Sequence, residues 1–285
     1  MSQRPRRVVP DEPPAGTRYK RHLTPSTALR DLWGSRTLLK ALAEREYRSR
    51  YHQTRLGMLW AVITPVLLML VFTAFVQRVA KVDTGDIPYP VFAYLGLLPW
   101  SFFSTSCSRG ASTLVLESSL VNKVRCPREV FPLATISTAF VDMLISAGVL
   151  AVIMLITTTA PKPTIVWVPF ILLVQVVATV GIVLLLAITI VYLRDLGQAL
   201  PLVLQLGLFA TPVAYGATTL IDRAGTWYAA VNPLVGVIES YRACVVGGTA
   251  PPWDLMLPST IGAVVWLLVG SWLFKRYEIG IADVA

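Results

Sequence analysis

The chain has 285 residues, of which 55% are hydrophobic and only 14% charged, and its mean hydropathy is +0.63. A soluble domain carries about 25% charged residues, so the composition excludes an ordinary soluble protein and indicates an all-α, polytopic membrane protein. The net charge of +9 raises nucleic acid as a partner, but 13 of the 25 Lys and Arg residues precede residue 57. That bias is typical of a cytoplasmic segment facing lipid headgroups, and no nucleic acid is expected.

The N-terminal region contains two predicted segments. Residues 1–25 are rich in proline and arginine and lack an apolar run, which predicts a disordered basic cytoplasmic tail. Residues 26–55 repeat apolar side chains at helical spacing between basic ones. This pattern predicts an amphipathic helix at the membrane interface; the alternative is an amphipathic helix packed on a partner protein.

Six apolar stretches follow, each near the roughly 20 residues that cross a bilayer core of about 30 Å. The predicted spans are 56–76, 91–116, 131–157, 165–192, 199–220 and 256–274. The second half of the second span is rich in Ser and Thr, so we expect it to face the bundle interior or water. Residues 193–197 form a tight turn between the fourth and fifth spans, and Pro201 and Pro212 are expected to interrupt the fifth.

The segments between spans set the expected orientation. A charged loop, 117–130, follows the second span, and residues 221–254 are apolar in part yet too short to cross, which predicts an outer re-entrant helix pair. With the N-terminus inside, the inner segments hold 19 Lys and Arg residues and the outer ones 5. Both termini, including the tail 277–285, are therefore predicted to be cytoplasmic.

The sequence contains no recognisable catalytic constellation. It has no phosphate-binding loop, no Gly-x-Ser-x-Gly and no HExxH, and its two histidines and three scattered cysteines do not predict a metal site or a disulfide set. No cofactor is expected on this chain. Arg109 and Asp142 are the ionisable residues within the predicted spans, and they are either functional-site candidates or a structural ion pair.

Aromatic residues gather on the first two spans and near the outer region. Their rings can stack on sugar rings, although belts at the membrane interfaces are the alternative explanation. The candidates for lining a conduit are Trp60, Phe72, Tyr94, Trp100, Phe103 and Tyr215.

Three stretches resemble a known family. These are Glu44–Trp60 followed by Pro65, then Val121–Pro132, and finally Asn232–Arg242. In this order on a six-span frame, they resemble the permease subunit of type-2 ATP-binding-cassette exporters of O-antigen, teichoic acid and other cell-wall polysaccharides. The resemblance covers about residues 29–280.

The resemblance implies a homodimer in the bacterial inner membrane, working with two ATPase subunits that hold the ATP and Mg²⁺. Its expected substrate is a polyprenyl-linked polysaccharide. The implied contacts with the ATPase are Asn122, Lys123, Arg125, Arg128 and Glu129. The implied outer cap contains Asn232, Pro233, Glu239, Tyr241 and Arg242. The alternatives are a permease for a drug or simple lipid, a membrane glycosyl- or acyltransferase, and a small secondary carrier.

Overall fold

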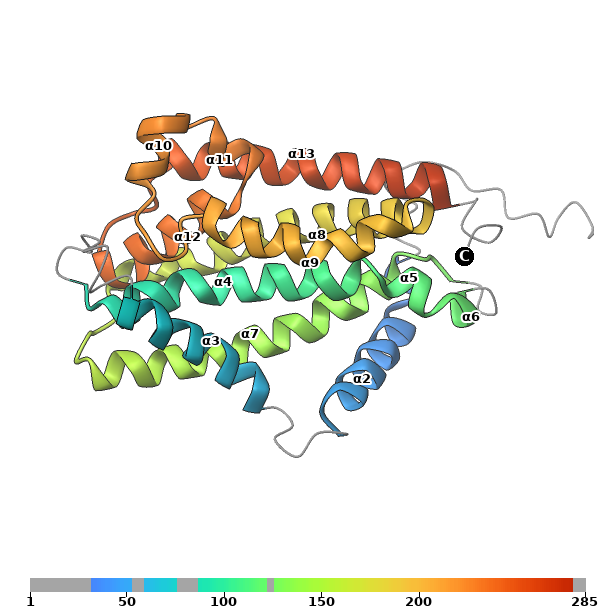
Figure 1. The fold of residues 1–285 in the computed structure, drawn as a ribbon, viewed down its shortest axis with the longest axis horizontal. Helices are drawn as coiled ribbons and strands as arrows, with labels where there is room; N and C mark the ends of the chain where they lie inside the picture. The colour runs from blue at the N-terminus through green and yellow to red at the C-terminus, as the bar shows by residue number, and fades with distance from the viewer. Residues whose placement is uncertain (1–31, 53–58, 76–86, 122–125, 279–285) are drawn as a thin grey trace, which may run out of the picture.

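The computed structural model describes residues 32–52, 59–75, 87–121 and 126–278, and every regular element within these ranges is a helix (Figure 1). The predicted tail 1–25 lies outside them. The N-terminal half contains α2 (Arg36–His52), α3 (Leu59–Phe72), α4 (Tyr89–Gly110), α5 (Thr113–Leu116), α6 (Ser118–Val121) and α7 (Val130–Ile156). The C-terminal half contains the 3₁₀ helix η3 (Pro163–Trp167), α8 (Val168–Tyr192), α9 (Arg194–Ala210), α10 (Thr218–Ala224), α11 (Tyr228–Val231), α12 (Leu234–Arg242), the π-helical turn η4 (Ala243–Gly247) and α13 (Trp253–Tyr277).

The first half of α4 forms the centre of the bundle. All residues from 91 to 100 are buried, and they pack against α7, α8 and α12 in one large apolar core. A helix that is apolar on every side is stable only when other helices or lipid surround it. The long helices α7, α8 and α13 run alongside α4, and α3 and α9 lie on the near side of it in Figure 1.

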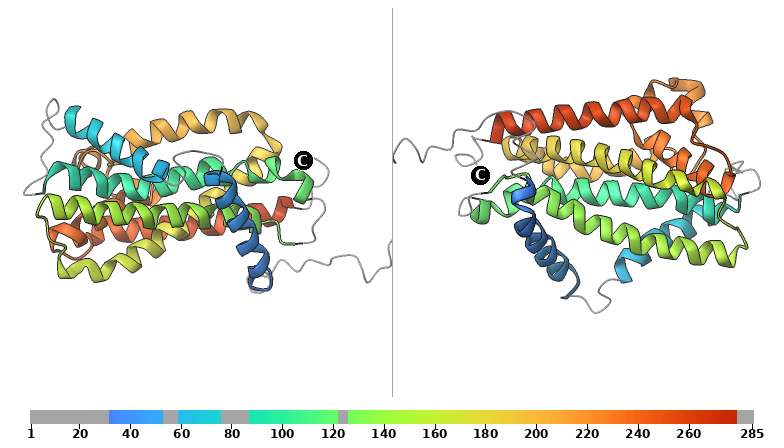
Figure 2. Two further views of the ribbon diagram at one scale, coloured as in Figure 1. Left: turned by 90° about the horizontal axis from the view of Figure 1, so that it is seen from below. Right: turned by 180° about the vertical axis from the view of Figure 1, so that it is seen from behind.

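Close backbone contact joins α8 to α13, which lie side by side in Figure 2. A Cβ atom on Gly270 would overlap the carbonyl oxygen of Gly181, and one on Gly181 would overlap the backbone of Trp266. Small residues allow helix backbones to approach closely inside a membrane, where packing drives association. The two glycines therefore determine how tightly α13 lies on α8.

A buried amide connects three helices at the centre of the fold. Gln175 of α8 donates a hydrogen bond from Nε2 to the carbonyl oxygen of Pro99 in α4, at 3.1 Å. Its Oε1 atom accepts a hydrogen bond from the hydroxyl of Tyr241 in α12, at 3.0 Å. A buried polar group requires such partners, so Gln175 fixes the relative placement of α4, α8 and α12.

Three helices in the described residues are long and apolar enough to cross a membrane by length and composition: 130–156, 163–192 and 253–277. They coincide with the third, fourth and sixth predicted spans. The first predicted span corresponds to α3 and the second to α4. Helix α4 ends at Gly110 and not near residue 116, and the short helices α5 and α6 follow it. The hydroxyl-rich half of α4 lowers the hydropathy of that helix.

The fifth span differs most from its prediction. Its helix, α9, begins at Arg194, directly after Leu193, and continues through Pro201 to Ala210. The expected turn 193–197 is thus mostly helical, and the expected helix to residue 220 is absent. Thr211 is extended because Pro212 follows it and disfavours a helical conformation there.

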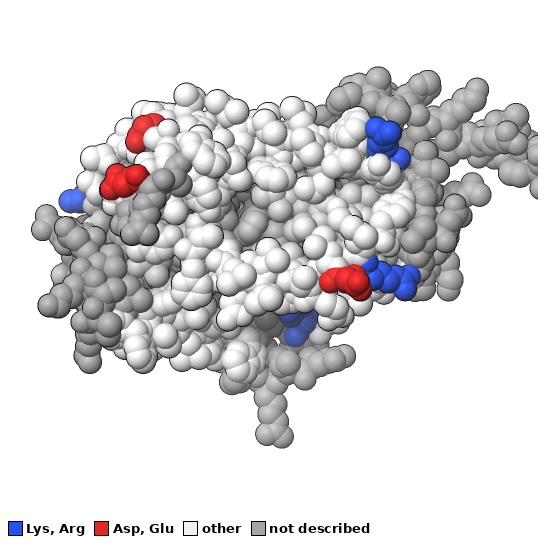
Figure 3. All heavy atoms as spheres, turned by 45° about the horizontal axis from the view of Figure 1, so that its top comes forward, with Lys and Arg blue, Asp and Glu red and all other residues white. Residues whose placement is uncertain are grey.

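Charged side chains of the described residues gather toward the two ends of the molecule in the view of Figure 3, and the surface between them is mostly uncharged. Many large apolar side chains are exposed on the helices, among them Leu155 of α7, Leu206 of α9 and Leu268 of α13. In water such a surface would be unfavourable, whereas hydrocarbon solvates it well.

Candidate functional site

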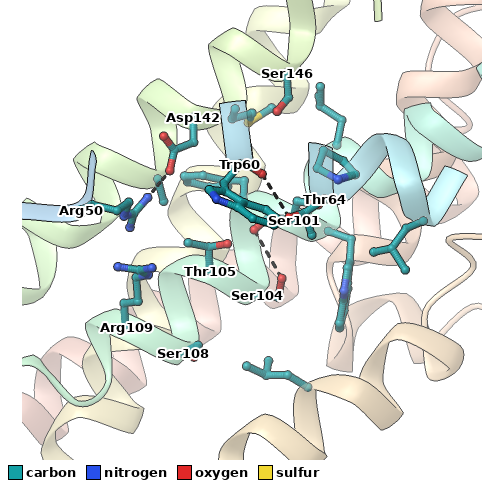
Figure 4. A pocket seen from close by; sticks show the side chains of 18 of the residues that line it. Arg50, Trp60, Thr64, Ser101, Ser104, Thr105, Ser108, Arg109, Asp142 and Ser146 are labelled. Carbon is teal, nitrogen blue, oxygen red and sulfur yellow. Dashed lines mark hydrogen bonds and ion pairs between the residues drawn. The ribbon is translucent and has the colours of Figure 1, made fainter. Parts of the chain in front are cut away.

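A cavity of about 590 Å³ lies against the second half of α4. Ser101, Ser104, Thr105 and Ser108 of α4 line it (Figure 4). Their spacing of three and four residues places all four hydroxyls on one face of the helix. The sequence prediction that this half of α4 avoids lipid is consistent with this position.

The opposite walls of the cavity come from α3 and α9. Trp60, Thr64 and Leu68 belong to α3, and Pro201 and Leu204 belong to α9. The indole of Trp60 and the hydroxyls of α4 thus face one common space (Figure 4). A surface that combines an aromatic face with several hydroxyls suits a ligand that has both apolar ring faces and polar edges.

Three charged residues line the same cavity. Arg50 of α2 forms an ion pair with Asp142 of α7, and Arg109 of α4 lies nearby (Figure 4). The side chains of Arg50 and Asp142 are only 10% and 16% exposed. Removing charges from water is costly unless they are paired. Each of these two side chains therefore needs the other to remain charged in the wall of the cavity. From the sequence, Arg109 and Asp142 could be functional-site residues or a structural ion pair; in the structure Asp142 pairs with Arg50.

Helix α2 packs on the bundle through further polar contacts. Thr135 of α7 donates a hydrogen bond to Glu46 Oε2 at 2.8 Å, and Arg50 lies 4.0 Å from Glu46 on the same face. Leu42 is buried against α7 and α8. One face of α2 is therefore held by α7.

The six predicted aromatic candidates do not share one location. Trp60 and Trp100 line the cavity, and Phe103 stacks on Trp100 with ring centroids 5.7 Å apart. Tyr94 is fully buried and Phe72 is 8% exposed, both within the apolar core, and neither lines the cavity. Composition identifies aromatic residues on a helix but not the face on which each one lies.

Tyr215 and Arg242 meet where the chain leaves α9 and packs against α12. The guanidinium of Arg242, in a residue that is 3% exposed, is stacked on the ring of Phe92 at 3.6 Å from its centroid. It donates hydrogen bonds to the carbonyl oxygens of Pro212 at 2.9 Å, Val213 at 2.6 Å and Tyr215 at 3.0 Å. One buried side chain thus satisfies the non-helical backbone that ends α9.

The other predicted cap residues support the same region. Glu239 accepts hydrogen bonds from Arg242 Nη1 at 3.0 Å and from the backbone N–H of Ala217 at 2.8 Å. Asn232 donates to the hydroxyl of Thr211 at 2.8 Å, and Pro233 directly precedes α12. With Tyr241 bonded to Gln175, all five predicted residues belong to one packed segment.

At the opposite end, the predicted coupling segment contacts the end of α13. Glu129 forms a buried ion pair with Lys275, and the backbone N–H of Arg128 donates to Glu278 at 3.2 Å. Asn122, Lys123 and Arg125 lie outside the described residues.

Comparison with known proteins identifies the family. The model of the ABC-2 type transporter family matches residues 37–246, from α2 to η4. This chain belongs to the ABC-2 type transporter family. The O-antigen export system permease protein RfbA of Myxococcus xanthus is 32% identical over 248 residues, which are 87% of this chain and 95% of that protein.

Two further relatives cover the chain almost as completely. RfbA of Klebsiella pneumoniae is 25% identical over 248 residues, 87% of this chain and 94% of that protein. The polysialic acid transport protein KpsM of Escherichia coli is 26% identical over 249 residues, 84% of this chain and 93% of that protein. The matched residues of this ABC-2 type chain include every residue that lines the cavity and the five predicted cap residues, whereas Lys275 and Glu278 lie beyond the family match.

Proposed function

We propose that this chain is the inner-membrane permease of an exporter that moves a lipid-linked polysaccharide out of the cytoplasm, driven by ATPase subunits on separate chains. The names of three relatives, which refer to O-antigen export and polysialic acid transport, support the substrate class. The observation that carries the proposal is the cavity in which hydroxyls on α4 face Trp60. Hydroxyls bond to sugar edges, and aromatic faces stack on sugar rings.

The proposed membrane arrangement has six spans, formed by α3, α4, α7, α8, α9 and α13, with both termini in the cytoplasm. The excess of Lys and Arg in the inner segments supports this orientation. It places the Arg242 segment at the outer side, as a re-entrant cap, and the Glu129–Lys275 contact at the inner side.

The proposed assembly is a homodimer with two ATPase subunits. Exposed apolar side chains on α3, such as Leu67 and Leu70, and on α9, such as Leu206 and Phe209, flank the cavity and suit a second copy. The segment 117–130 is the proposed contact with the ATPase. ATP would shift the permease pair from one conformation to another only if the ATPase subunits bind ATP with different affinity in the two conformations.

A strain that lacks this chain tests the proposal by complementation. The wild-type gene restores surface glycan, and the double variant Ser104→Leu/Thr105→Val, which replaces two cavity hydroxyls by apolar groups, leaves lipid-linked glycan in the cytoplasm. Thr260→Val is the matched control, because the Thr260 hydroxyl bonds within α13 to the carbonyl oxygen of Met256. Normal export by the double variant would contradict the role of the cavity.

The partner ATPase provides the second arm of the test. Deleting the ATPase gene, or inactivating its ATP site, should abolish export although this chain is present. Glycan movement without any ATPase would overturn the exporter proposal. Complementation of drug or simple-lipid export, with unchanged surface glycan, would favour the related permease class instead.

A further inference from the structure

A second cavity, of about 670 Å³, lies between the C-terminal half of α7 and the start of α8. One face of α7 forms its longest wall, with Leu144, Ala147, Leu150, Ala151, Met154 and Leu155. These residues recur every three or four positions, as one face of a helix requires. The rest of the lining is also almost entirely apolar, so this groove differs from the hydroxyl-lined cavity.

The dimensions of the groove match one hydrocarbon chain. From Leu144 to Leu155, which both line it, α7 rises about 17 Å at roughly 1.5 Å per residue. One leaflet contributes about half of a hydrocarbon core of roughly 30 Å. An apolar space of this kind does not hold water well, and leaving it empty forfeits contacts along its walls. A single acyl chain fills it, whereas a long polyprenyl chain exceeds it.

The outer mouth of the groove has an unusual backbone. Thr158, at the C-terminal end of α7, has a φ of +53°, and within the described residues it is the one residue other than glycine with a positive φ. A β-branched residue in this conformation is strained. Such a backbone conformation persists only where contacts with the surrounding structure hold it in place. The turn directs Thr158, Thr159 and Pro161 into the lining of the mouth.

A positive charge lies beside this mouth. The backbone N–H of Lys162 donates to the carbonyl oxygen of Val245 at 2.9 Å, which fixes the loop against η4. The Lys162 side chain is exposed, passes over Gly248, and forms no ion pair within the described part of the chain. Lys162 directly follows Pro161, which lines the groove, so its long side chain can bring an ammonium group to a phosphate headgroup at the mouth.

We propose that this groove binds one acyl chain of an anionic phospholipid from the outer leaflet, with its phosphate beside Lys162. The assignment to the outer leaflet rests on the orientation given under Proposed function. Leu98 and Met143 line both this groove and the hydroxyl-lined cavity. The bound acyl chain therefore packs against the lipid-facing side of the wall formed by Leu98 and Met143. The other side of this wall faces the proposed substrate pathway.

Native mass spectrometry of the purified full-length chain tests this proposal, with phosphatidylglycerol and phosphatidylcholine as probes. Ala151→Phe projects a ring into the groove from an exposed position. Val152→Phe is the matched control, because Val152 is also exposed on α7 and does not line the groove. We expect wild type and Val152→Phe to retain phosphatidylglycerol, and Ala151→Phe to bind it about tenfold more weakly, because several buried methylenes are displaced.

Lys162→Gln tests the headgroup. It should remove the preference for phosphatidylglycerol over phosphatidylcholine while lipid binding persists. Cross-linking by a phosphatidylglycerol that carries a diazirine in its acyl chain provides a readout that needs no variant, and it should label the groove face of α7. Equal retention by Ala151→Phe and Val152→Phe, or labelling confined to the Val152 face, would overturn the proposal. So would retention of polyprenyl phosphate in place of phospholipid. None of these readouts depends on glycan export, so they remain interpretable even if the proposed function fails.

Discussion

Arg50 and Asp142 form an ion pair between α2 and α7 at the wall of the hydroxyl-lined cavity. The pair belongs to two segments that the sequence places in different environments, an interfacial helix and a membrane span. A change in the position of α2 would therefore move Arg50 and alter the wall of the cavity. Because α2 leads into α3, which forms another wall of the same cavity, this contact links the position of α2 to the shape of the cavity.

Neutralising one member of this pair should destabilise the protein. Breaking a fully buried pair costs about 3–5 kcal/mol because a charge remains without compensation, and the residual exposure of these side chains brings the expected loss for Arg50→Gln to about 2–3 kcal/mol. Thermal unfolding of the purified chain in detergent measures this loss.

A nearby exposed pair provides the control. Arg48 and Glu44 are paired on the same helix but are 68% and 55% exposed, so Arg48→Gln should change stability by less than about 0.5 kcal/mol. The double variant Arg50→Gln/Asp142→Asn should lose less than the sum of its single variants. Additive losses, or equal losses for Arg48→Gln and Arg50→Gln, would refute the role of the pair.

Arg242→Met should strongly reduce the yield of folded protein. The substitution leaves the carbonyl oxygens of Pro212, Val213 and Tyr215 without their buried donor, at about 1–3 kcal/mol for each unsatisfied group. Size-exclusion chromatography of the fluorescently tagged chain measures the yield.

Two milder variants test this explanation. Glu239→Gln keeps an oxygen that accepts from Ala217 and Arg242 but removes the carboxylate partner of the buried guanidinium, so it should lower the yield less than Arg242→Met does. Arg276→Met removes an exposed guanidinium from the end of α13 and should have little effect. If Arg242→Met folded as well as Arg276→Met, the outer segment would have to be stabilised in another way.

Hydropathy and charge bias predict much of the fold, because lipid forces apolar stretches to be helical whatever their neighbours. The bounds of α7, α8 and α13 agree with the predictions to within about three residues at most ends, which is the usual uncertainty of helix ends. Hydropathy alone did not predict the end of α9, although Pro212 marked an expected interruption there. The path of the chain after Pro212 was not predictable, because its backbone carbonyl groups find their partner in a distant residue, Arg242.

The candidate site was predictable in part for the same reason. Hydroxyls at helical spacing on α4 identify a face that avoids lipid without reference to any other helix. By contrast, Trp100 lines the cavity and Tyr94 is buried in the core, although they lie only six positions apart on α4. Which aromatic residue reaches the cavity depends on how α3 and α9 are placed, and that placement is a property of tertiary packing.

Gly270→Ala should weaken the contact between α8 and α13. The new methyl group would overlap the carbonyl oxygen of Gly181, and overpacking of a tight contact costs about 1–3 kcal/mol. Gly148→Ala is the control, since its methyl group meets no atom within 4 Å. The melting temperature of Gly270→Ala should fall relative to both wild type and Gly148→Ala. Equal melting temperatures would show that α13 can shift away from α8 without cost.

Cys126 should react slowly with maleimide at neutral pH. Burial raises the pKa of its thiol above the ordinary value, and the carboxylates of Glu278 and Glu129 raise it further, whereas Arg128 lowers it. The thiolate is the reactive form, so the rate should increase about tenfold for each pH unit while the pH is below that pKa. Labelling is measured in a Cys107→Ser/Cys244→Ser background, which leaves Cys126 as the single thiol.

Glu278→Gln separates the effect of charge from that of exposure. Removing one negative charge lowers the pKa of Cys126, so labelling at neutral pH should become faster, and the wild-type and variant rates should converge once the pH exceeds both pKa values. Arg128→Gln should have the opposite effect at neutral pH. A constant ratio of rates at every pH would instead mean that the substitution opens the contact between the coupling segment and α13, because greater exposure accelerates labelling at every pH by the same factor.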